Sequence, residues 1–142
     1  MGTDIRPECS KKNKYWISKH RYYELKHYCL QYNEWREEYT KLRSELGCFG
    51  GNGVIFAGAK AAGEYSDRTG EMAVRLAELK RNIDLVEKTC GDADGALWSY
   101  ILKGVTEGIG YPALTVLYDI PCSVDTYYDR YRRFFWLLDK EV

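Results

Sequence analysis

Apolar residues recur at intervals of three and four over most of this chain, and no segment alternates convincingly between apolar and polar residues. The first spacing is that of one helix face, whereas alternation is typical of a strand. The sequence therefore predicts an all-α fold, a small helical domain. Helices are expected at 18–32, 34–46, 67–90, 95–105, 112–118 and 123–138.

Residues with special backbone preferences predict where these helices begin and end. Ser18, Asp94 and Ser123 have the short polar side chains that cap helix N-termini. Asn33 is expected to separate the first two helices or to re-cap the second, and Gly91 is expected to end the third.

A glycine-rich stretch interrupts the helical pattern. Six glycines fall within the seventeen residues 47–63, where neither helical nor strand periodicity is visible. This composition predicts a flexible linker. A phosphate-binding loop is not supported, because there is no GK[ST] motif and no preceding strand. The chain is thus divided into an N-terminal helical arm (1–46), a linker (47–66) and a helical core (67–142).

The charge balance limits the partners that can be expected. Of 142 residues, 45% are hydrophobic and 30% are charged, and 21 basic residues balance 21 acidic ones. Such a composition is that of an ordinary soluble globular protein. Without an overall positive charge, binding to nucleic acid has to rest on a local patch.

The cysteines do not suggest a disulfide framework or a zinc site. Cys9, Cys29, Cys48, Cys90 and Cys122 are an odd number, are widely spaced and contain no CxxC pair. Reduced thiols in a cytoplasmic protein are the simpler interpretation. No signal peptide and no apolar run of membrane-spanning length is visible, so no membrane association is expected.

No residue pattern indicates an enzyme. His20 and His27 are seven residues apart, which is not the i, i+3 or i, i+4 spacing that places two ligands around one metal ion. No Ser/His/Asp or Cys/His set is recognisable. The sequence therefore predicts no catalytic activity, no metal and no cofactor.

The last helix combines an aromatic face with arginines. Its apolar residues follow helical spacing without a miss and predict a core face. The opposite face then carries Thr126, Arg130 and Arg133 outward, with Arg132 on the flank. The predicted core face consists of Val124, Tyr127, Tyr128, Tyr131, Phe134, Phe135 and Leu138.

The order of short helix, turn and longer helix over 112–138 is that of a helix-turn-helix unit. In that geometry the second helix enters the major groove of double-stranded DNA. Thr126, Arg130 and Arg133 would face the bases, with Ser123 near phosphate, because arginine forms bidentate bonds with guanine and phosphate. The alternative is that the arginines form only a solvated face.

The N-terminal stretch KKNKYWISKHRYY alternates bases with aromatic residues. This pattern is compatible with contacts to a nucleic-acid backbone, which would involve Lys14, Lys19 and Arg21. The alternative is an arm whose rings cover the core and whose lysines keep it soluble.

Three segments carry a resemblance. IPCSVDTYYDRYRRFFWLL, with YILKGVTEGIGY and RYYELKHYCLQYNEW, resembles RinA/ArpU-like late transcriptional regulators encoded by phages and prophages of Gram-positive bacteria. The resemblance covers Tyr15 to about Arg43 and Leu76 to Leu138. It implies a sigma-like helix-turn-helix and a cytoplasmic DNA-binding regulator of late genes, which acts on a promoter or with host RNA polymerase. The implied recognition residues are Ser123, Thr126, Arg130, Arg132 and Arg133.

Two other functions stay open from the sequence. A neutral chain with thirteen tyrosines and four tryptophans can bind a host protein, for example as an inhibitor of a defence nuclease, because these residues anchor interfaces. The amphipathic helix at 67–90 can instead mediate self-association. A homodimer would also fit the DNA-binding hypothesis, because dimeric readers match two-fold operators.

Overall fold

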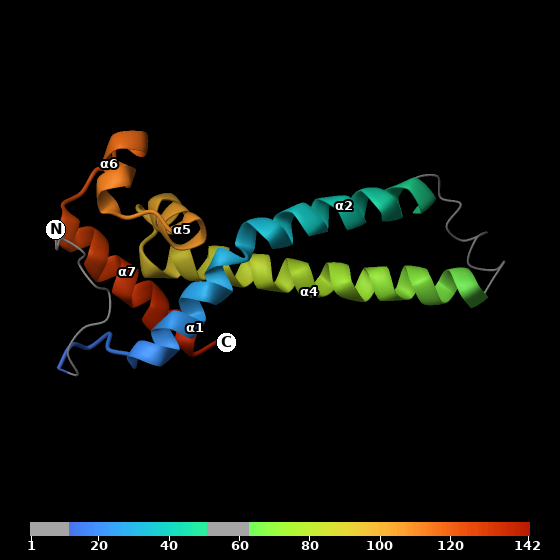
Figure 1. Ribbon diagram of the computed structural model, residues 1–142, viewed down its shortest axis with the longest axis horizontal. Helices are drawn as coiled ribbons and strands as arrows, with labels where there is room; N and C mark the ends of the chain where they lie inside the picture. The colour runs from blue at the N-terminus through green and yellow to red at the C-terminus, as the bar shows by residue number, and fades with distance from the viewer. Residues whose placement is uncertain (1–11, 51–62) are drawn as a thin grey trace. The chain divides into compact units, whose positions relative to one another are not determined.

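The computed structural model describes residues 12–50 and 63–142, with side chains for 12–47 and 67–142. All regular structure in these ranges is helical, which confirms the prediction of an all-α protein. The helices, shown in Figure 1, are α1 (Lys19–Leu30), α2 (Tyr32–Gly50), α4 (Gly63–Ala93), α5 (Trp98–Glu107), α6 (Tyr111–Tyr118) and α7 (Val124–Asp139).

Both predicted serine caps are present. The Ser18 side chain accepts a hydrogen bond from the backbone N–H of Arg21 at 3.3 Å, and Ser123 accepts one from Thr126 at 3.2 Å. The break between the first two helices, however, lies at Gln31, two residues before Asn33. α1 ends at Leu30, and the N–H of Gln31 turns back to the carbonyl of Tyr28, which tightens the last turn.

The third helix does not end at Gly91. α4 continues to Ala93, because a glycine within a helix costs only about 1 kcal/mol and its neighbours Cys90 and Ala93 are buried. Asp94 follows, and its carboxylate accepts hydrogen bonds from the N–H groups of Ala96 and Leu97 at 2.8 and 3.1 Å. It therefore caps a turn, and α5 begins only at Trp98.

Both ends of the predicted linker, 47–66, are helical. α2 continues through Gly50 and α4 begins at Gly63, so residues 47–50 and 63–66 are helical. Helical propensity is a weak preference, and glycines near a helix end do not always terminate it. The rest of the predicted linker, 51–62, lies outside the described residues.

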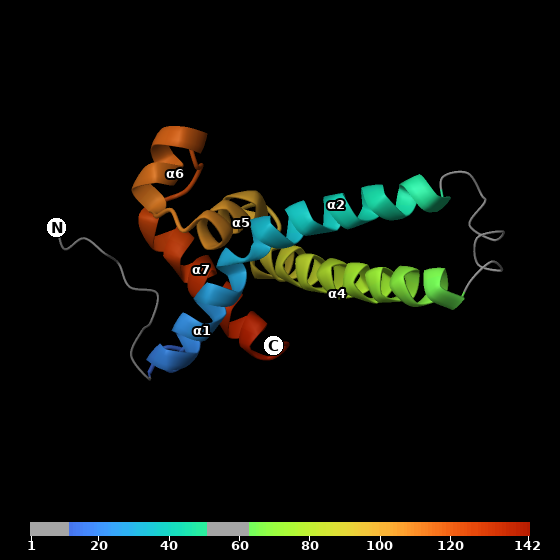
Figure 2. The ribbon, with the colours of Figure 1, turned by 45° about the vertical axis from the view of Figure 1, so that its right-hand side comes forward.

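Contacts divide the chain into two units that differ from the predicted domain boundaries. One unit joins the described residues up to Tyr32 with Leu85–Val142, and the other is Asn33–Asp84. The N-terminal helix is grouped with the C-terminal ones because α1 packs against α5 and α7, and α5 packs against α6 and α7 (Figure 2). Residues that are fully buried in this first unit include Leu25, Cys29, Val86, Cys90, Ile101, Val105, Leu114, Tyr127, Phe134 and Leu138.

The second unit is a helical hairpin. α2 and α4 run side by side in opposite directions in both ribbon views (Figures 1 and 2). Arg75 donates two hydrogen bonds to the carboxylate of Glu38, at 2.8 and 2.9 Å, which lowers the pKa of Glu38. Among this unit's described side chains, Trp35 and Leu79 alone are buried, so the hairpin leaves much of its apolar face half-exposed.

Replacing the cap of the last helix tests how α7 begins. We expect Ser123→Ala to lower the free energy of unfolding by about 1 kcal/mol, because the N–H of Thr126 loses its acceptor. Urea unfolding measures the loss. Ser99→Ala is a matched control on an exposed serine inside α5, and an equal effect of both substitutions would contradict the capping role.

Candidate binding surface of the C-terminal helices

The predicted succession of short helix, turn and capped helix is present in α6 and α7. α6 ends at Tyr118. Its C-cap residue Asp119 has a left-handed backbone (φ 53°) that redirects the chain, and the N–H of Asp119 donates a hydrogen bond to the carbonyl of Thr115. Ile120 is buried in the turn, and the Tyr111 hydroxyl donates to the carbonyl of Cys122. These contacts hold the turn between the two helices in one conformation.

The aromatic face of α7 is the predicted core face. Its ring contacts are dense: the centroid of Phe135 lies 5.0 Å from those of Tyr22 and Tyr131, and 4.9 Å from that of Phe134. Val124 and Tyr128 are only half-buried. The buried residues of α7 are Tyr127, Tyr131, Phe134, Phe135 and Leu138.

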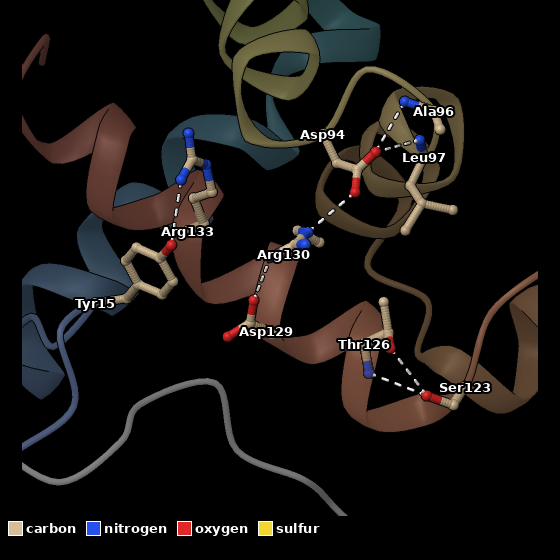
Figure 3. Close-up of polar contacts among 9 residues, drawn as sticks. All are labelled: Tyr15, Asp94, Ala96, Leu97, Ser123, Thr126, Asp129, Arg130 and Arg133. Carbon is tan, nitrogen blue, oxygen red and sulfur yellow. Dashed lines mark hydrogen bonds and ion pairs between the residues drawn. The ribbon is translucent and has the colours of Figure 1, made fainter.

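Arg130 is already paired with carboxylates. Its Nε lies 3.0 Å from Oδ2 of Asp94, and its Nη1 lies 2.6 Å from Oδ2 of Asp129 (Figure 3). Its side chain is 38% exposed. Two carboxylates therefore compensate the charge that was expected to face DNA.

The other two arginines are also drawn toward the protein. Arg133 donates a hydrogen bond from Nη1 to the hydroxyl of Tyr15 at 3.2 Å, and this bond lowers the pKa of Tyr15 (Figure 3). Arg132 is half-buried, and its Nε has no hydrogen-bond partner within the described residues. The structure thus differs from the prediction that Arg130 and Arg133 point freely outward, because Asp94 and Tyr15, which are remote in sequence, lie beside α7 and bind them.

The N-terminal end of α7 carries no compensating positive charge. Ser123 and Thr126 are exposed as predicted, and their hydroxyl groups lie 3.1 Å apart. Asp119 and Asp125 are exposed close by in sequence. From 119 to 142, four basic residues oppose five acidic ones, a net charge of −1.

The N-terminal candidates have different environments. Lys14 and Lys19 are exposed, and Nζ of Lys14 lies 5.0 Å from the centroid of the Tyr15 ring. Arg21 instead ties α1 to the end of α7, with its Nε 2.5 Å from the Asp139 carboxylate and its Nη2 2.6 Å from the carbonyl of Val142. Tyr15 is buried, so at least this ring of the arm covers the core.

The most exposed apolar residues of this unit lie on α6, and the sequence analysis did not single them out. Val116 is 82% exposed and Leu117 is 62% exposed, and the Tyr118 ring follows them with Nζ of Lys103 5.1 Å from its centroid. We call Val116–Tyr118 the α6 patch. The sequence of α6 already indicates this exposure, because YPALTVLY is apolar at most positions and a two-turn helix at a surface can bury only one side.

The acid response of Asp94 tests the arrangement around Arg130. Burial raises the pKa of Asp94, but the N–H groups of Ala96 and Leu97 and the guanidinium of Arg130 outweigh it, so the net pKa is lowered. The ionised form therefore stabilises the fold above the unfolded-state pKa of about 3.9, and this contribution is lost as the pH falls.

We accordingly expect Asp94→Asn to lower the free energy of unfolding by about 0.5–1 kcal/mol at pH 7 and by much less near pH 2. Urea unfolding at both pH values measures the difference. The exposed Asp67→Asn serves as control. A loss that is equal at both pH values would show that the carboxylate charge is not what matters.

In comparisons with known proteins, no family model matched the chain, and no curated protein or solved structure was significantly similar to it. The resemblance to phage regulators therefore stays a prediction. None of the described helices is both long enough and apolar enough to cross a membrane. In residues 12–50 and 63–142, no group of three or more His, Cys, Asp or Glu residues is placed to hold a metal ion.

Proposed function

We propose that this chain is a protein-binding adaptor or inhibitor that recognises its partner through the α6 patch. The observation that carries the proposal is the exposure of Val116 and Leu117, two adjacent branched apolar residues. Single exposed apolar residues are common on soluble proteins, whereas a contiguous run with a tyrosine at its end is typical of an interaction site. The turn behind the patch is fixed by Ile120, so little ordering would be needed on binding.

The charges near the patch indicate the chemistry of the partner. Asp119 directly follows Tyr118, and Asp125 lies in the first turn of α7; both are exposed. A partner surface with an apolar pocket bordered by basic side chains complements this arrangement. A host nuclease, with the basic surface that nucleic-acid substrates require, is one protein of this kind.

A second candidate function is that of a DNA-binding regulator of phage late genes. The arrangement of α6 and α7 supports it, with α5 packed against both helices and Ser123 and Thr126 exposed at the start of the second. DNA binding would require Arg130 to exchange its carboxylate partners for phosphate, at a site where Asp125 and Asp129 oppose phosphate. The paired arginines favour the protein-binding function over this one.

A double substitution tests the α6 patch. Val116→Ser/Leu117→Ser removes its apolar groups, and the matched control Val74→Ser removes a 60% exposed valine in the other unit. The three tagged proteins are used for affinity purification from host extract, and the recovered partner is purified and titrated by calorimetry. We expect the double variant to bind it at least about tenfold more weakly, and Val74→Ser to bind like the wild type.

The same proteins separate the two candidate functions. Protein binding through the apolar α6 patch with two flanking carboxylates depends less steeply on salt than duplex binding, in which many phosphate contacts release counter-ions. A partner that binds both variants equally well would contradict the proposal. Tight, salt-sensitive binding of a duplex fragment that Thr126→Glu abolishes would favour the DNA-binding regulator instead.

A further inference from the structure

The hairpin of α2 and α4 carries a groove that the α6 patch does not involve. This groove is shallow, with a volume of about 410 Å³. Tyr39 and Leu76 are half-buried in its floor, and Ala73 and Ala77 are exposed at its surface. The lining residues are Tyr39, Ala73, Leu76, Ala77, Lys80 and Arg81.

Positive charge surrounds the apolar floor. Lys80 and Arg81 line the groove on α4. On α2, Arg43 is exposed and lies four residues after Tyr39, which places it beside Tyr39 on the same side of the helix. Asp84 pairs with Lys80 at 3.0 Å and offsets one of these three charges.

The other side of the hairpin has a different charge pattern. There Arg75 is held by Glu38 and Glu78, so its charge is compensated within the unit. The hairpin thus has one basic, apolar side and one side of internally paired charges.

We propose that this groove binds an amphipathic helix with acidic flanks from a partner protein. The apolar floor accepts the non-polar face of such a helix, and the arginines on both sides pair with its carboxylates. A second copy of this chain laid on the same groove would bring Arg43 and Arg81 against their counterparts, which is repulsive. Duplex DNA is acidic too, but it has no continuous apolar face to cover Tyr39, Leu76 and the two alanines.

A synthetic peptide provides the test. It has twenty residues, with leucine at helical i, i+3, i+4 and i+7 positions and glutamate at most others, and carries a fluorescent label for anisotropy titration. A scrambled peptide of the same composition keeps the charge and loses the apolar face. We expect the full chain to bind the amphipathic peptide at least about tenfold more tightly than the scrambled one.

Substitutions then locate the site. Ala77→Glu adds a bulky acid to the groove and should weaken binding at least about tenfold, whereas Ser44→Glu, five residues beyond Tyr39 on an exposed position of α2, should leave it unchanged. Circular dichroism verifies that both variants fold. If Ala77→Glu does not fold, Arg43→Glu and Arg81→Glu together should give the same loss without touching the floor.

Three results would overturn the inference: no binding, equal binding of both peptides, or displacement of the amphipathic peptide by an equimolar 20-base-pair duplex. The first and second remove the helix-binding groove, and the third assigns it to nucleic acid. Val116→Ser/Leu117→Ser should bind the peptide like the wild type, so failure of the α6 patch and failure of this groove are distinguishable.

Discussion

Replacing Gly104 with alanine is expected to destabilise the protein strongly, although alanine is the better helix former. Gly104 is a buried position in α5, and a Cβ built there lies within clashing distance of the Tyr127 hydroxyl oxygen. Tyr127 is fully buried and cannot swing into solvent. We expect a loss of about 3 kcal/mol in the free energy of unfolding, measured by urea denaturation.

Two controls isolate the clash. Gly91→Ala changes a helical glycine whose surroundings are open, so it should stabilise by about 0.5–1 kcal/mol. Tyr127→Phe removes a buried hydroxyl that has no partner in the described residues, so it should be close to neutral. Combined with Gly104→Ala, it should recover most of the loss, because the remaining neighbours lie at 3.4 and 3.5 Å. A Gly104→Ala protein as stable as the wild type would contradict this packing.

The second large effect is expected at the centre of the aromatic core. Phe135→Ala should lower the free energy of unfolding by about 3–5 kcal/mol, because the ring is almost fully buried and contacts Tyr22, Tyr131 and Phe134. Thermal and urea unfolding measure the loss. Since Tyr22 belongs to α1, the substitution should also loosen the attachment of α1 to α7.

Phe135→Leu and Tyr23→Ala test the origin of that loss. Leucine keeps most of the volume and should cost about 1.5 kcal/mol. Tyr23 is an exposed aromatic residue of α1, and its removal should cost less than about 1 kcal/mol. Equal losses from Phe135→Ala and Tyr23→Ala would show that burial in this cluster is not what holds the unit together.

Local sequence signals predicted the helices well. The spacing of apolar residues gave the core face of α7, and the side chains of Ser18 and Ser123 gave the starts of α1 and α7. Two of the boundary errors fell at glycines. Gly47 and Gly91 lie within α2 and α4, because the penalty for a helical glycine is only about 1 kcal/mol, and at Gly91 the buried Cys90 and Ala93 offset it.

The environment of the arginines could not be predicted from local signals. Helical spacing placed Arg130 and Arg133 opposite the aromatic face, but their partners come from distant parts of the chain. Asp94 is 36 residues away from Arg130, and Tyr15 is 118 residues away from Arg133. The packing of α1 and α5 against α7 brings these groups together, so helical spacing alone predicts exposed charges where the fold has paired them.

The presence of an exposed apolar patch on α6 is predictable from the sequence. The eight residues of α6 are apolar at more positions than a two-turn surface helix can bury, and the excess has to be exposed or covered by a partner. The sequence does not reveal which side is exposed, because Leu114 faces the core while Val116 and Leu117 do not. That choice depends on where α5 contacts α6.

Hydrogen exchange of the chain in complex with its purified partner tests the central claim most directly. If the α6 patch is the recognition surface, the amides of Thr115–Tyr118 become protected on binding, while those in the first turns of α7 change little. Unchanged exchange in α6 together with new protection at Ser123–Arg133 would place recognition on α7 and contradict the account.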